Sequence, residues 1–237
     1  MEVYILICCR TVYALAYVSF FQEGSKGMTT FSQFGQDVYT LTNIYPGVTN
    51  GYFVEVGAYD GVNMSNTLLM EQNGWSGLCI EPNPRLFAQM TRWRHCLKSQ
   101  YAVFNTDDAI VEFYDDPTGG CSSIVETDVS ANRFPVIRVA TKTLTTLLNE
   151  HNAPSFIHYL SLDTEGSEYE ILNAHNFSAY TFGYICVEHN FHEENRAKIR
   201  SLLESKGYLF HRTNHVDDEY CLRELPSVLS YLKTLSF

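Results

Sequence analysis

The chain has 237 residues, 45% of them hydrophobic, which is enough for one α/β domain with a complete core. Its formal net charge is −11 at pH 7. Because proteins that bind phosphate backbones need a basic surface, we expect no nucleic-acid partner. The densest basic cluster, within 85–98, is interpreted as the solvated face of a helix.

The chain contains seven cysteines, with no C-x-x-C pair and no zinc-ligand spacing. Cys79 and Cys186 fall inside apolar stretches, where a free cysteine behaves as a small hydrophobic residue. An odd number of cysteines without a disulfide framework favours reduced thiols. We therefore predict a reducing compartment, the cytoplasm, and no catalytic cysteine.

The N-terminal segment 3–21 is mostly apolar, with Arg10 near its centre. About 20 apolar residues span a bilayer, but a central arginine costs about 3 kcal/mol there. No basic stretch precedes the segment, as one would in a signal peptide. Three interpretations stay open: a non-native leader over 1–27 with initiation at Met28, a weak membrane anchor, or a helix that packs on the domain. We place the folded domain at 28–237 and expect membrane contact only if the segment is an anchor.

The stretch FVEVGAYDG at 53–61 reads as an apolar strand that runs into a turn bracketed by glycines. Gly57 allows a sharp turn, and Gly61 lets the backbone approach a ligand without a Cβ. The spacing differs from the G-x-G-x-x-G of dinucleotide binders, and no P-loop lysine follows. With Glu55 and Asp60 but no cation nearby, the turn suits an uncharged or cationic ligand. S-adenosylmethionine, which carries a sulfonium, fits this chemistry.

A second predicted strand, GLCI, ends in Glu81 about 20 residues after the glycine turn. In Rossmann-type folds an acidic side chain at this place hydrogen-bonds the ribose diol of the cofactor. Pro82 and Pro84 end the strand, and Pro84 can begin the next helix. The sequence therefore predicts a cofactor-binding half at these two strand ends.

Two later apolar runs also end in polar residues. The run 156–162 suits a buried strand and is followed by Asp163, and the run 182–187 is followed by Glu188 and His189. In open α/β sheets, ligands bind at the carboxyl ends of the strands, so these side chains are expected at one rim. Asp163 could also be the N-cap of the following helix.

The alternation of strands and helices predicts crossover units and a mainly parallel sheet, with an antiparallel hairpin formed by the last two strands. The glycine- and serine-rich segment 115–124 is either a mobile loop over the ligand or a plain surface turn. The pattern predicts strands at 52–56, 77–81, 99–104, 110–114, 135–140, 156–162, 181–187, 207–212 and 218–222, and helices at 33–43, 65–73, 84–94, 143–150, 167–174 and 193–205.

The chain contains five ordered motifs: SQFGQD (32–37), FVEVGAYDGVNMSNT (53–67), GLCIEPNP (77–84), YLSLDTEGSEYEIL (159–172) and VEHN (187–190). With them the chain resembles, from about Ser32 to about Leu222, the FkbM family of S-adenosylmethionine-dependent methyltransferases. The resemblance implies a Rossmann-like methyltransferase fold: a seven-stranded, mostly parallel sheet with an antiparallel edge hairpin and helices on both faces. It also implies O-methylation, often of sugars or polyketides.

A sugar hydroxyl is a weak nucleophile, so a base, a metal ion or both must assist the transfer. We predict Asp163, Glu188 and His189 as the catalytic residues, and the same three as ligands of Mg²⁺ or Mn²⁺. Glu168, in the first turn of a helix, is interpreted as structural. The predicted cofactor-binding residues are Glu55, Gly57, Asp60, Gly61, Ser65, Asn66, Thr67, Glu81, Pro82 and Asn83.

The leading hypothesis is an O-methyltransferase that acts on a hydroxyl of a sugar or glycan. The alternatives are a methyltransferase of a small natural product or lipid, with an acceptor pocket lined by aromatic residues of 110–140, and a non-catalytic adaptor that retains the fold. The acceptor, the dependence on metal and the oligomeric state stay open at this point.

Overall fold

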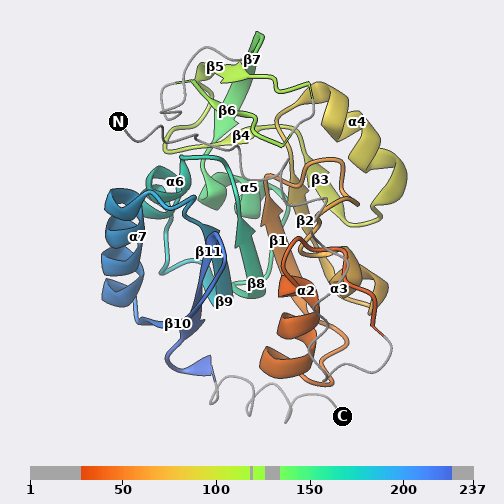
Figure 1. Ribbon diagram of the computed structural model, residues 1–237, viewed down its shortest axis with the longest axis vertical. Helices are drawn as coiled ribbons and strands as arrows, with labels where there is room; N and C mark the ends of the chain where they lie inside the picture. Colours follow the sequence, from red (N-terminus) through yellow and green to blue (C-terminus); the bar gives the residue numbers. More distant parts are fainter. Residues whose placement is uncertain (1–27, 118–119, 126–133, 226–237) are drawn as a thin grey trace, which may run out of the picture.

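The computed structural model describes residues 28–117, 120–125 and 134–225 (Figure 1). The predicted leader over 1–27, with the alternative anchor at 3–21, lies outside these ranges. Within them, no helix combines the length and the hydrophobicity that crossing a bilayer requires.

The main sheet has seven strands and is mostly parallel, which confirms the predicted α/β fold class. The strand β11 runs antiparallel to both of its neighbours, whereas every other neighbouring pair is parallel. Buried apolar residues such as Val54, Leu78 and Leu160 fill the central strands, as expected for a sheet covered on both faces. In spatial order the strands are β10 (Tyr208–Asn214), β11 (Asp217–Leu222), β9 (Thr181–Glu188), β8 (Phe156–Leu162), β1 (Tyr52–Val56), β2 (Ser76–Ile80) and β3 (Leu97–Ser99).

Helices cover both sides of this sheet, with α6 and α7 on one side and α2, α3 and α4 on the other (Figure 1). The helix α4 begins where Asn83 accepts hydrogen bonds from the backbone N–H groups of Arg85 and Leu86, with Pro84 in its first turn. The helical elements are α2 (Gln36–Tyr39), which continues as a π-helical turn (Thr40–Ile44), α3 (Leu68–Gln72), α4 (Pro84–Trp93), α5 (Leu144–Glu150), α6 (Glu168–Ala174) and α7 (Glu193–Ser205).

A second, four-stranded sheet lies above the carboxyl ends of β1 and β8 (Figure 1). The sequence predicted strands in this region but not a separate sheet, and its single strand at 99–104 is divided between the two sheets. The physical reason is a small apolar core that includes Phe104, Phe113 and Val139. The strands, in spatial order, are β4 (Ala102–Val103), β7 (Val136–Lys142), β5 (Ile110–Tyr114) and β6 (Ser123–Ile124).

The described cysteines agree with the predicted thiol state only in part. Cys79, Cys96, Cys186 and Cys221 are free, whereas Cys121 is disulfide-bonded. The expectation of an entirely reduced set therefore does not hold at Cys121, and the reducing compartment stays a prediction.

Candidate active site

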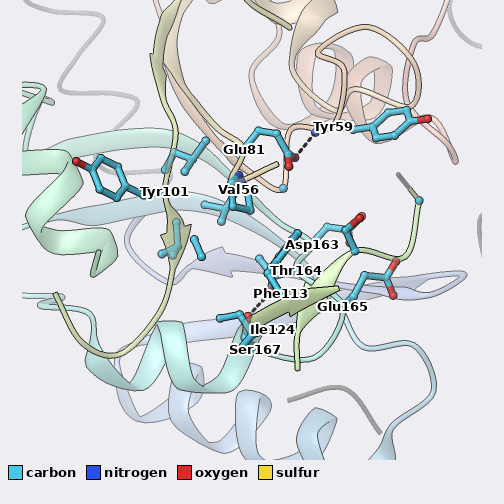
Figure 2. Close-up of a pocket in the computed structure, with 17 residues that line it drawn as sticks. Val56, Tyr59, Glu81, Tyr101, Phe113, Ile124, Asp163, Thr164, Glu165 and Ser167 are labelled. Atoms are coloured by element: carbon cyan, nitrogen blue, oxygen red, sulfur yellow. Dashed lines mark hydrogen bonds between the residues drawn. The ribbon is translucent and has the colours of Figure 1, made fainter. Parts of the chain in front are cut away.

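A pocket lies between the carboxyl ends of the main-sheet strands and the small sheet (Figure 2). Its empty space is about 520 Å³ including the mouth to solvent. The main sheet and the loops after it contribute Val56, Gly57, Tyr59, Ile80, Glu81, Pro82, Asp163, Thr164, Glu165 and Ser167. The small sheet and its connections contribute Tyr101, Ala102, Val103, Phe113, Gly120, Ser122 and Ile124.

The turn after β1 brings the backbone against the end of β8 at Gly57. This residue has φ +80°, and a Cβ built on it would lie 1.8 Å from the carbonyl oxygen of Asp163. Its N–H donates to the carbonyl of Ile80 at 3.0 Å, and the N–H of Asp163 donates to the carbonyl of Val56 at 3.1 Å. Only glycine fits this crossing point, because the carbonyl oxygen of Asp163 occupies the space that a Cβ would need.

Glu81 lies in the pocket at the end of β2, and its side chain is held by backbone groups. Its carboxylate accepts hydrogen bonds from the N–H of Tyr59 and the N–H of Asn83, each at 2.9 Å. The next residue, Pro82, also lines the pocket. The side chain of Asn83 instead caps α4 and donates to Asp115 at 2.6 Å. Glu81 thus has the position expected of a ligand to a ribose diol.

Glu55 does not line the pocket, although the sequence placed it at the cofactor. Its buried carboxylate accepts hydrogen bonds from Ser65 Oγ (3.0 Å), the N–H of Asn66 (2.7 Å) and Thr67 Oγ1 (2.7 Å). The guanidinium of Arg94 lies 3.2 Å from it, with its side chain fully buried. These residues therefore fix the segment after the turn, and Arg94 is not part of a solvated helix face as the sequence suggested.

The remaining turn residues also act on the backbone rather than on the pocket surface. Asp60 Oδ1 accepts hydrogen bonds from the N–H groups of Val62 (2.9 Å) and Asn63 (2.8 Å), which closes the turn. A Cβ on Gly61 would lie 2.7 Å from Met90 Cγ, so Gly61 lets α4 approach the turn.

Three carboxylates meet at the rim of the pocket. Oxygen atoms of Asp163, Glu165 and Glu188 lie within 4.8 Å of one another. Asp163 and Glu165 line the pocket, and their carboxylates lie on the same side of it in Figure 2. Glu188 is buried at the end of β9. The expected trio is thus corrected, because Glu165 takes the place of His189 in the cluster.

His189 faces the protein rather than the pocket. Its Nδ1 accepts a hydrogen bond from the N–H of Phe191 at 3.0 Å, and its Nε2 lies 3.8 Å from Asp218 Oδ1. Burial, together with the guanidinium of Arg196, lowers the pKa of His189 from its ordinary value and favours the neutral ring. With Nδ1 accepting, the ring proton is on Nε2, which is buried and has no hydrogen-bond partner among the described residues. His189 does not line the pocket, so the imidazole is not positioned as a base for a ligand there.

Glu168 has the structural role that the sequence predicted. Its Oε1 accepts hydrogen bonds from the N–H (2.8 Å) and the Oγ1 (2.9 Å) of Thr164, at the start of α6. It thereby shapes the loop that carries Glu165 into the pocket.

The motif SQFGQD, noted above only for the family resemblance, lies next to the site. Ser32 forms a β-bridge with Met64, in the segment that follows the glycine turn. The buried Asp37 accepts a hydrogen bond from Ser32 Oγ at 2.7 Å, and Gln36 Nε2 donates to Asp217 at 2.6 Å. The motif therefore connects the cofactor turn to the edge hairpin.

Sequence reasoning missed the pocket residues that depend on the small sheet. A strand was predicted at 110–114, but only its pairing with β7 turns Phe113 toward the main sheet. Tyr59 lies inside the glycine motif, but the sequence alone does not show that its φ is positive or that it lines the pocket. The missed pocket residues include Tyr101 and Val103 on the side of the small sheet, and Tyr59 and Thr164 on the side of the main sheet.

A model of the methyltransferase FkbM domain matches residues 55–210. The chain belongs to this family. Membership makes it an S-adenosylmethionine-dependent methyltransferase. The matched range contains Glu55, Glu81, Asp163 and Glu188, and it excludes the SQFGQD motif. No curated protein gives a significant match to the chain.

Solved structures show distant likenesses. A fibrillarin pre-rRNA processing protein from Methanococcus jannaschii has a TM-score of 0.47 at 10% identity, covering 81% of this chain and 75% of that one. A precorrin-6y C5,15-methyltransferase from Geobacter metallireducens has a TM-score of 0.37 at 10% identity, covering 73% and 81%. A SAM-dependent methyltransferase from Aquifex aeolicus has a TM-score of 0.37 at 12% identity, covering 73% and 84%. Each score is below 0.5, so these likenesses carry no functional argument.

Proposed function

We propose that this FkbM-family methyltransferase methylates a hydroxyl group of a sugar or glycan. The observation that carries the proposal is the composition of one pocket, in which Glu81 lies between an apolar wall and the carboxylates of Asp163 and Glu165. An uncharged substrate with many hydroxyl groups can donate hydrogen bonds to these carboxylates, whereas a polyanionic substrate would be repelled by them.

The pocket fits the family's cofactor. Glu81 would accept hydrogen bonds from the ribose hydroxyls, and the side of the pocket with Val103 and Phe113 would hold the adenine. The part of the pocket lined by Gly57 and Asp163 would hold the methionine end. When bound, S-adenosylmethionine supplies an electrophilic methyl group on a sulfonium centre.

The residues at the rim would position and deprotonate the acceptor. Asp163 would accept the hydroxyl proton as the oxygen attacks, while Glu165 would accept hydrogen bonds from neighbouring hydroxyls. A positioned base contributes about 10²–10⁴-fold to the rate, or about 3–5 kcal/mol, against about 7–11 kcal/mol for alignment of the reactants. Removing Asp163 should therefore slow the reaction without abolishing the binding of cofactor.

A divalent cation belongs to the same proposal as a second cofactor. Carboxylate oxygens are the ligands that Mg²⁺ and Mn²⁺ prefer, so Asp163, Glu165 and Glu188 would hold the ion. It would supply Lewis-acid activation of the acceptor hydroxyl. His189 has no part in this set.

The test combines labelled methyl transfer to a panel of rhamnosides, fucosides and other glycosides with calorimetry of the cofactor. We expect transfer to at least one glycoside, cofactor binding weakened by Glu81→Gln, and turnover lowered by Asp163→Asn with the cofactor Kd unchanged. Binding of cofactor without transfer to any glycoside would contradict the sugar acceptor. It would favour a small natural product or lipid, for which the apolar wall with Phe113 and Ile124 is the supporting observation. No binding at high micromolar cofactor would favour the adaptor.

A further inference from the structure

We propose that the ring of Tyr59 recognises the positive charge of the sulfonium, so that this pocket prefers the methyl donor to its neutral thioether product. The inference rests on the proposed cofactor site but does not depend on which acceptor is methylated.

Tyr59 is held in an unusual backbone conformation at the pocket. Its φ is +55°, in the left-handed region that a bulky side chain rarely adopts. In this conformation its N–H donates to the carboxylate of Glu81 at 2.9 Å, while the N–H of Gly61 donates to the carbonyl of Ala58 at 2.9 Å and closes the turn around it. One backbone conformation thus holds the group expected to bind the ribose diol and sets the point at which the side chain of Tyr59 leaves the backbone.

The ring of Tyr59 extends to the same side of the pocket as the carboxylates of Asp163 and Glu165 (Figure 2). Tyr101 lies on the opposite side, and Glu81 lies between the two tyrosines in that view. The ammonium of Lys142 lies 5.0 Å from the centre of the Tyr101 ring. The pocket therefore has two different arms. One is acidic and contains Tyr59. The other, called the apolar arm, is lined mainly by apolar residues such as Val103 and Phe113 and contains Tyr101, with the Lys142 ammonium near its ring.

The difference between the two arms determines the orientation of the cofactor in the pocket. The base and the sulfur-bearing carbon are attached at opposite ends of the ribose ring, so a diol held at Glu81 sends them to opposite arms. Adenine, which is flat and uncharged, matches the apolar arm with Val103 and Phe113. The sulfonium consequently enters the arm formed by Tyr59 and the carboxylate of Asp163.

An aromatic face attracts a cation through its quadrupole, and this attraction is absent for an uncharged sulfur. The product, S-adenosylhomocysteine, has the same adenosine and amino-acid groups as the donor but lacks the transferred methyl group and, with it, the charge on sulfur. Comparing the two ligands therefore separates the contribution of the methyl sulfonium from all the contacts that they share.

The experiment is isothermal calorimetry of S-adenosylmethionine and S-adenosylhomocysteine with the full chain and three variants. Tyr59→Leu removes the π face but keeps an apolar side chain and the N–H that holds Glu81. We expect it to weaken binding of the methionine form by roughly three- to tenfold and to change binding of the homocysteine form by less than about twofold. Tyr59→Phe keeps the π face and should preserve the ratio of the two dissociation constants. Tyr101→Leu, the matched control in the apolar arm, should weaken both ligands by the same factor.

An unchanged ratio in Tyr59→Leu, with both ligands binding to the wild type, would overturn the inference and leave the proposed function intact. Binding of neither ligand to the wild type would overturn both. If circular dichroism shows that Tyr59→Leu does not fold, a fluorinated phenylalanine at position 59 keeps the ring shape while weakening its π face. The ratio should then fall as fluorine is added, and a constant ratio would refute the sulfonium contact.

Discussion

Replacing Gly57 with alanine is the substitution for which the structure makes the sharpest prediction. The new Cβ would lie 1.8 Å from the carbonyl oxygen of Asp163, and the positions of both atoms are set by the backbone at the ends of adjacent strands. No rotamer change can relieve a contact between a Cβ and a main-chain oxygen. The end of β1 must therefore move more than about 1 Å away from β8, because carbon and oxygen need well over 3 Å.

The expected cost has two parts. A left-handed conformation costs a non-glycine residue about 1–2 kcal/mol, since φ at this position is +80°. Separation of the strand ends also breaks the hydrogen bond from the N–H of Asp163 to the carbonyl of Val56, which leaves buried groups unpaired at about 1–3 kcal/mol. Gly57→Ala should thus lower the free energy of unfolding by about 2–5 kcal/mol and weaken cofactor binding.

Urea unfolding followed by tryptophan fluorescence measures this cost, and calorimetry measures cofactor affinity. Gly35→Ala is the matched control, because Gly35 has φ +76° but no atom within 4 Å of the position that a Cβ would occupy, so only the conformational part applies. We expect the control to lose about 1–2 kcal/mol. If the two variants lose the same amount within about 0.5 kcal/mol, the contact with Asp163 does not constrain the turn and the reasoning is refuted.

Three further predictions concern charge. Arg94→Met should lower the free energy of unfolding by about 3–5 kcal/mol, because it leaves the carboxylates of Glu55 and Glu71, 3.2 and 2.7 Å from the guanidinium, without their partner; a loss below about 1 kcal/mol in urea unfolding would contradict this. Burial lowers the pKa of His158 to about 4 and that of His175 to about 4, so the folded state resists protonation of both rings. The free energy of unfolding should be highest above about pH 6.5 and fall as the pH drops toward 4, by roughly 2 kcal/mol for each ring at pH 5. If the free energy of unfolding of the double variant His158→Gln, His175→Gln falls just as steeply with pH, the loss belongs to other groups. Chelation of divalent cations should remove methyl transfer and added Mg²⁺ or Mn²⁺ should restore it, whereas full activity in chelator would eliminate the metal from the proposal.

Much of the main sheet could be predicted because its signals are local. The strands at 52–56 and 156–162 have the predicted bounds, since glycine or a polar turn residue flanks each apolar run. The second sheet could not be predicted in this way. Apolar and polar residues alternate along its strands β5 and β7, as they do along many edge strands. Only the pairing of β5 with β7, over a core that includes Phe113 and Val139, separates these strands from the main sheet.

The site shows the same division between local and long-range information. Glu81 and Asp163 could be placed at one rim because each follows directly after a parallel strand, and parallel strands end at a common edge. The direction of His189 could not be read from its place after β9. Its ring is turned by the N–H of Phe191, two residues later, and by Asp218 on β11, which the sequence does not connect to it.

Glu55 is the instructive case, because the sequence contained the information that would have corrected it. Side chains alternate along a strand, so Glu55 must face away from its neighbour Val56, which lines the pocket. A carboxylate buried on that opposite face needs a cation or several donors, and Arg94 supplies the charge from the end of α4. The acidic residue of the glycine motif therefore holds the shape of the cofactor turn from behind, while Glu81, at the end of the neighbouring strand, is the carboxylate that reaches the pocket.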